Sequence, residues 1–160
     1  MPGATSFADV PENRTRVVIV DADHRVREGV VAAIELAGGL EVVGQAGYLL
    51  AAVSLIAETS PDVVILDPRL PDVDGGTALV TSVRKLGLST RILLMSWSVE
   101  HENADLVKAV DAFIDKCAPP EAFVQAIVAG VRGLPGSRRL TGARVEPDPD
   151  PEVILRGLIL

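Results

Sequence analysis

Three short runs of β-branched and aliphatic residues each end in a charged side chain, and this feature constrains the fold most strongly. The runs are VVIVDAD at 17–23, VVILDPRLPDVDGG at 63–76 and FIDKCAP at 113–119. A buried strand that ends in a charged residue before a turn places that residue at the carboxyl edge of a parallel sheet, where open α/β folds build their sites. Asp21, Asp67 and Lys116 are therefore expected to converge on one pocket.

Strand-like and helix-like segments alternate around these runs, which is the pattern of a parallel sheet covered on both faces. Strands are expected at 16–20, 41–45, 62–66, 91–95 and 111–114, and helices at 25–37, 48–58, 75–86, 99–108 and 120–132. Val26, Val30 and Ile34, for example, have the spacing of one helix face. Five βα units of this size predict a doubly wound α/β fold with the flavodoxin-like strand order 2-1-3-4-5.

Composition sets limits on partners and location. With 160 residues, of which 48% are apolar, the chain can bury the core of one domain. The formal net charge of −7 argues against direct contact of this domain with nucleic acid, because phosphate neutralisation requires clustered Lys and Arg. The single cysteine excludes an internal disulfide. Neither a signal-like N-terminus nor a long apolar run is present, so a cytoplasmic chain with no membrane contact is expected.

The two ends of the chain have a different character from its centre. Residues 1–14 are polar with two prolines and are expected to be a flexible leader, followed by one domain over 15–133. Residues 134–160 are expected to be a linker, marked by EPDPDP, and a short apolar tail, VILRGLIL. Three interpretations of this tail stay open: it docks in a groove, makes an oligomer contact, or begins a segment that continues beyond Leu160.

Three segments, taken in order, resemble the receiver domains of two-component response regulators, of the NarL/FixJ type. They are RVVIVDADHRVREGV, EVVGQAG and PDVVILDPRLPDVDG, and the resemblance extends over roughly 15–133. It implies that Asp67 is the phosphoacceptor, whose carboxylate forms an acyl phosphate. It further implies that Ser96 and Lys116 bind the phosphoryl group, and that Ser96 and Phe113 act as the switch.

The resemblance also implies a Mg²⁺ site formed by Asp21, Asp67 and the main-chain carbonyl of Arg69. The second acid of the usual pair is replaced by Ala22. Asp23 follows one residue later, where a side chain points in a different direction. We therefore expect Mg²⁺ binding to be weakened.

The implied function is that of a receiver module in a two-component phosphorelay. A sensor histidine kinase or a small phosphodonor would modify Asp67. The face formed by 99–108, 111–114 and 120–132 would then change its preference for a protein output partner or for a second copy of the chain. Such a module promotes its own phosphorylation but is not a turnover enzyme.

Departures from the family pattern leave other functions open. Trp97 stands where a small residue is usual, and the segment from Ser96 to Lys116 is slightly shorter than usual. With Ala22, these features leave open a phosphorylation-independent pseudo-receiver, and the linker leaves open the receiver part of a DNA-binding transcriptional regulator. Trp97 either covers the pocket or offers its ring to a partner. Three further residues lack metal-ligand spacing and are expected to have no functional role: His24, His101 and Cys117.

Overall fold

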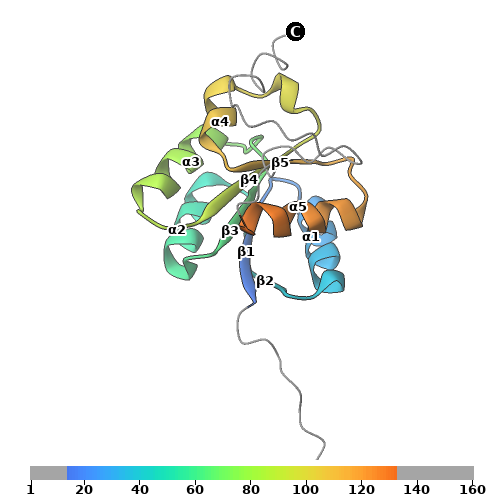
Figure 1. Ribbon diagram of the computed structural model, residues 1–160. Helices are drawn as coiled ribbons and strands as arrows, with labels where there is room; N and C mark the ends of the chain where they lie inside the picture. The colour runs from blue at the N-terminus through green and yellow to red at the C-terminus, as the bar shows by residue number, and fades with distance from the viewer. Residues whose placement is uncertain (1–13, 133–160) are drawn as a thin grey trace, which may run out of the picture.

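The computed structural model describes residues 14–132, which fold around one parallel sheet (Figure 1). Its strands are β1 (Thr15–Val20), β2 (Leu40–Ala46), β3 (Val63–Leu66), β4 (Arg91–Ser96) and β5 (Ala112–Asp115), and they are arranged in the order β2-β1-β3-β4-β5. The predicted flavodoxin-like α/β fold and its strand order are confirmed. The predicted leader, except its last residue, and the predicted linker and apolar tail lie outside the described residues.

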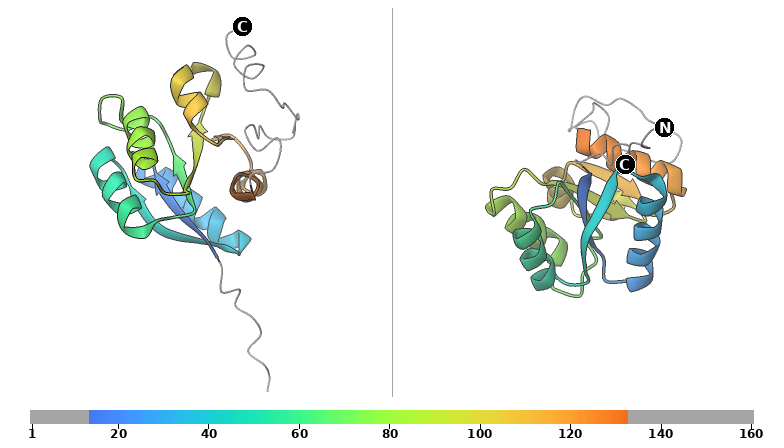
Figure 2. Two further views of the ribbon diagram at one scale, coloured as in Figure 1. Left: turned by 60° about the vertical axis from the view of Figure 1, so that its left-hand side comes forward. Right: turned by 90° about the horizontal axis from the view of Figure 1, so that it is seen from below.

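Helices connect the strands and cover both faces of the sheet. α1 (His24–Ala37) and α5 (Pro120–Arg132) pack together on one face, and α2 (Leu49–Thr59), α3 (Gly75–Lys85) and α4 (Ala104–Ala109) cover the other (Figure 2). Because all neighbouring strands are parallel, their carboxyl ends lie at one edge of the sheet. Within 14–132, no helix is both long and apolar enough to cross a lipid bilayer.

Side chains that alternate along the central strands divide the core into two halves. Ile19 and Ile65 face α1 and α5, whereas Val20 and Leu66 face α2, α3 and α4, and all four are fully buried. Strands covered on both faces need no polar positions. This explains the uninterrupted apolar runs of β1 and β3, and it places the first polar residue after each run at the edge of the sheet.

The segment between β4 and β5 differs from the single helix predicted at 99–108. A 3₁₀ turn, η1 (Val99–His101), comes first, and α4 begins only at Ala104. The side chain of Asn103 caps α4, because its oxygen accepts hydrogen bonds from the backbone N–H groups of Asp105 (2.8 Å) and Leu106 (3.3 Å). Asn is a strong N-cap, so it starts a new helix at this point. The interruption leaves Glu102 next to the end of β4.

The loop between β3 and α3 is held against the end of β3 by close packing. A Cβ atom on Gly76 would lie 2.8 Å from Cα of Pro68, and one on Gly75 would lie 2.9 Å from Cβ of Leu70. Asp72 also ties this loop to α2, because its Oδ2 accepts a hydrogen bond of 2.8 Å from the N–H of Leu49. The loop that follows Asp67 is thus fixed on two sides.

Candidate functional site

The carboxyl ends of β1, β3 and β5 bring together the three charged residues singled out in the sequence. Asp21 and Asp67 follow the last residues of β1 and β3, two neighbouring strands in register. Lys116 follows β5, and its Nζ lies 2.8 Å from Oδ2 of Asp21 and forms a second ion pair with Oδ2 of Asp67. The side chain of Lys116 is only 6% exposed, and both acids are buried. One ammonium group therefore bridges two carboxylates that would otherwise repel each other in a buried site.

Each carboxylate uses its other oxygen to hold its own loop. Oδ1 of Asp21 accepts a hydrogen bond of 2.8 Å from the N–H of Asp23, and Oδ1 of Asp67 accepts one of 2.7 Å from the N–H of Arg69. These contacts between a side chain and the backbone two residues later are the mechanism by which Asp stabilises turns. They orient Oδ2 of each acid toward the ammonium group.

Electrostatics keep the central lysine protonated. Burial alone would lower the pKa of Lys116, but the hydrogen bonds and negative charges of Asp21 and Asp67 outweigh it and raise that pKa above its ordinary value of 10.5. The site therefore combines a positive charge with an acid that can act as a nucleophile. This is the combination that a phosphoryl group requires, because charge on its oxygens must be neutralised during transfer.

Ser96 is the last residue of β4 and is buried beside this site. Its main-chain oxygen accepts a hydrogen bond of 3.0 Å from the N–H of Lys116, which links it to the end of β5. Its hydroxyl donates to Oε1 of Glu102 at 2.5 Å and accepts a hydrogen bond of 3.2 Å from the N–H of Ser98. Glu102 was not predicted as a site residue, because nothing in its spacing from Ser96 marks it.

The side chains of two other predicted residues do not belong to the buried ion-pair cluster. The side chain of Arg69 is 58% exposed, and its Nη2 lies 3.8 Å from Oε1 of Glu102. Phe113 is buried in β5 opposite Leu94, in the half of the core that faces α2, α3 and α4. Its role as a switch stays a prediction, and in this structure it is a core residue.

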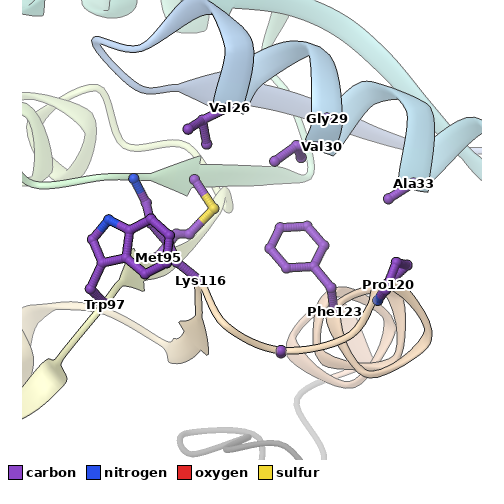
Figure 3. Close-up of a pocket in the computed structure, with 10 residues that line it drawn as sticks. Val26, Gly29, Val30, Ala33, Met95, Trp97, Lys116, Pro120 and Phe123 are labelled. Carbon is purple, nitrogen blue, oxygen red and sulfur yellow. The ribbon is translucent and has the colours of Figure 1, made fainter.

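Trp97 lies beside the charged site and lines a groove between α1 and α5 (Figure 3). Nζ of Lys116 is 5.7 Å from the centre of its ring, a distance at which a cation and an aromatic face attract each other. The ring remains 54% exposed. The groove, of about 220 Å³, is otherwise lined mainly by apolar side chains that include Val26, Met95 and Phe123. Trp97 thus lies near Lys116 with about half of its side chain exposed, and whether it covers the pocket or offers its ring to a partner stays a prediction.

The loop after β1 shows where the replaced acid and its neighbour lie. Ala22 is exposed, and Asp23 caps α1, because its Oδ1 accepts a hydrogen bond of 2.9 Å from the N–H of Arg25. The carboxylate of Asp23 is therefore engaged as the N-cap of α1. Arg27, which the sequence did not single out, donates a hydrogen bond of 2.5 Å from Nη1 to the main-chain oxygen of Asp21.

The three residues that lack metal-ligand spacing in the sequence have separate surroundings in the structure. His24 lies 3.1 Å from Glu28 on α1, and His101 contacts the hydroxyl of Ser98 at 2.8 Å. Cys117 is an exposed free thiol. Among the described residues, no group of three or more His, Cys, Asp or Glu side chains is arranged to hold a metal ion.

Comparisons with known proteins agree with this geometry. The family profile of the response regulator receiver domain matches residues 17–128. The chain is 45% identical over 83 residues to the probable transcriptional regulatory protein NarL of Mycobacterium tuberculosis, an alignment that covers 52% of the chain and 38% of that protein. It is 32% identical over 137 residues to the nitrate/nitrite response regulator protein NarP of Escherichia coli, covering 83% of the chain and 59% of that protein.

A solved structure extends the comparison to three dimensions. The signal receiver domain of NarL from Mycobacterium tuberculosis superimposes with a TM-score of 0.66 at 35% identity, covering 76% of the chain and 99% of that domain. The chain thus matches the whole of a receiver domain, while it spans only 38% and 59% of the two full-length relatives.

Proposed function

The chain belongs to the response regulator receiver domain family, and we propose that Asp67 is the residue on which it accepts a phosphoryl group. As a receiver domain of two-component response regulators, it is a signalling module. The assignment of Asp67 rests on its ion pair with the buried ammonium of Lys116. The pair lies at the carboxyl edge of the sheet, where β3 and β5 both end. We propose a self-modifying switch, not a turnover enzyme.

The positions of the side chains support an in-line transfer to Asp67. An oxygen of Asp67 attacks the phosphorus of the donor in line, so that a new P–O bond forms while the bond to the donor's leaving group breaks, and the electron pair departs with that group. Lys116 then stabilises negative charge on the transferred oxygens, since its ammonium already lies beside Oδ2 of Asp67. Ser96 supplies a hydroxyl donor once its present bond to Glu102 is released.

Mg²⁺ is the cation we propose for this site. Asp21 and Asp67 offer two buried carboxylates on adjacent strand ends, and Arg69 follows with a main-chain carbonyl. Two carboxylates fit an ion that takes oxygen ligands and retains several waters. Bound there, Mg²⁺ would neutralise phosphoryl charge. With Ala22 in place of a further acid and Asp23 used as a helix cap, we propose that binding is weaker than a complete acid pair would give.

Partners follow from the family and from the exposed segments. We propose that a sensor histidine kinase or a small phosphodonor supplies the phosphoryl group, in the cytoplasm. We also propose that the signal leaves through the face formed by α4, β5 and α5, toward an output protein or a second copy of the chain. NarL of Mycobacterium tuberculosis is named a probable transcriptional regulatory protein, and for this chain a DNA-binding output remains a proposal.

Intact-mass measurement after incubation with acetyl phosphate and Mg²⁺ tests the proposal. The parent is expected to gain one phosphoryl group, and Asp67→Asn is expected to gain none. Asp23→Asn is the matched control, because it removes an exposed carboxylate from the same edge of the sheet and should leave the gain intact. A folded parent that gains nothing from acetyl phosphate or from a histidine kinase would instead support the pseudo-receiver function.

A further inference from the structure

We propose that Glu102 is a positioning residue that holds Ser96 and Arg69 in the unphosphorylated state and competes with the phosphoryl group for both. This inference rests on the proposed function, because it concerns the regulation of phosphorylation at Asp67. Glu102 is neither a predicted site residue nor a member of the buried trio. It is the residue at which η1 ends, immediately before the Asn103 cap of α4.

The hydrogen bond between Ser96 and Glu102 occupies the hydroxyl that a phosphoryl group would need. The hydroxyl has one proton, and it donates that proton to Oε1 of Glu102 at 2.5 Å. Its oxygen already accepts a hydrogen bond from the N–H of Ser98. The same proton cannot be shared with an oxygen on Asp67 until the contact with Glu102 breaks. The side chain of Glu102 is only 11% exposed, so this hydrogen bond to a carboxylate is little weakened by water.

Arg69 is a second, cationic partner of the Glu102 oxygen that accepts the hydrogen bond from Ser96. Nη2 of Arg69 lies 3.8 Å from Oε1 of Glu102, while the N–H of Arg69 donates to Oδ1 of Asp67 at 2.7 Å. Arg69 is therefore tethered beside the phosphoacceptor, with its guanidinium directed toward Glu102. A phosphoryl group on Asp67 would bring close to two negative charges and three acceptor oxygens to this position. It offers both donors a stronger partner than one carboxylate.

Because Glu102 lies between η1 and α4, the release of Ser96 and Arg69 from Glu102 also frees the junction of these two elements. Glu102 separates η1 from α4, so its contact with Ser96 anchors this junction to the end of β4. When Ser96 and Arg69 turn to the phosphoryl group, Glu102 loses both partners and the anchor is released. The η1–α4 segment belongs to the face through which we expect the signal to leave. Glu102 thus couples the chemistry at Asp67 to that face, as a two-state element biased by a ligand.

The test is the affinity of the parent and variants for beryllofluoride, a phosphoryl analogue, at saturating Mg²⁺. Glu102→Gln retains the shape of the side chain and a neutral acceptor, but a hydrogen bond to a charged acceptor is roughly twice as strong. The substitution therefore weakens the hydrogen bond that holds Ser96 in the protein without analogue. Less free energy is then needed to release Ser96, and the dissociation constant for beryllofluoride is expected to fall about tenfold. Glu100→Gln is the matched control, because it removes an exposed carboxylate from the same 3₁₀ turn, and it should change the constant less than about twofold.

Glu102→Gln could also tighten binding simply by removing charge repulsion between Glu102 and the analogue. Repeating the substitution in a Ser96→Ala background distinguishes this effect from the loss of the hydrogen bond to Ser96. If Glu102 acts through Ser96, most of the gain from Glu102→Gln disappears in Ser96→Ala, leaving only a small part due to Arg69. A full gain in that background, or no gain beyond that of Glu100→Gln, would overturn the proposal. The amide resonance of Ser98 reports the contact without any analogue. It should shift in Glu102→Gln and not in Glu100→Gln, and an unchanged resonance in both would also overturn the proposal.

The outcome also distinguishes this inference from the function on which it rests. A parent that binds beryllofluoride, with a Glu102→Gln variant that binds it no more tightly, contradicts the role of Glu102 alone. If neither protein binds the analogue and neither gains mass from acetyl phosphate, the proposed phosphoacceptor function is contradicted as well.

Discussion

Replacing Lys116 with Met should destabilise the domain because it leaves two buried carboxylates without their shared partner. Lys116 lies 2.8 Å from Asp21 and pairs also with Asp67, and the side chains of all three are between 4% and 6% exposed. Removing one partner from a buried ion pair costs about 3–5 kcal/mol. Met fills much of the volume of Lys, so lost packing contributes little to this figure. With a urea m-value of about 2 kcal/mol per molar, the midpoint of unfolding should fall by about 2 M.

The pH dependence of stability gives this prediction a second signature. In the parent the pKa of Lys116 is raised by folding, so its contribution is complete below the ordinary value of 10.5 and is lost as the pH rises through the folded-state pKa. Lys116→Met should lack this alkaline loss.

Urea unfolding followed by circular dichroism measures both effects. Lys108→Met is the matched control, because Lys108 is exposed on α4 and its loss should change stability by less than about 0.5 kcal/mol. Adding Asp67→Asn to Lys116→Met should restore part of the lost stability, because one buried charge is removed. A Lys116→Met protein as stable as the control at pH 7, or one that still shows the alkaline loss of the parent, would refute the electrostatic account of this site.

Other perturbations test the loops and the proposed Mg²⁺ site. Gly76→Ala places a Cβ against the backbone of Pro68 and should lower stability by about 1–3 kcal/mol, whereas Gly29→Ala has open space in α1 and should raise it by about 0.5–1 kcal/mol, both measured by urea unfolding. Ala22→Asp should lower the Mg²⁺ dissociation constant severalfold in a calorimetric titration, and an unchanged constant would show that the added acid does not reach the ion. Trp97 is the single tryptophan and contacts the site ammonium, so its fluorescence should change when beryllofluoride binds, and a constant spectrum would place its ring outside the switch.

The sheet and the charged edge follow directly from local sequence signals. An uninterrupted apolar run that ends in Asp or Lys fixes both the burial of a strand and the position of its last side chain, and this reasoning located Asp21, Asp67 and Lys116. The break before α4 was missed, although Asn103 followed by Ala-Asp is a recognisable N-cap signal.

The contacts of Glu102 and Arg27 could not be predicted in the same way. Both residues have the appearance of ordinary surface charges in the sequence, and their partners are set by how a loop folds back in three dimensions. Glu102 reaches Ser96 only because η1 and α4 are separate elements, and Arg27 reaches the main chain of Asp21 from the second turn of α1. Neither contact has a periodic signature.

Locating the modified residue tests the central claim most directly. After incubation with acetyl phosphate and Mg²⁺, borohydride reduction converts an acyl phosphate on an aspartate into homoserine, which peptide mass spectrometry assigns to a position. We predict homoserine at Asp67 in the parent and none in a sample that was not exposed to the donor. An unmodified Asp67 in a folded, phosphorylated protein, or homoserine at Asp21 instead, would contradict the account.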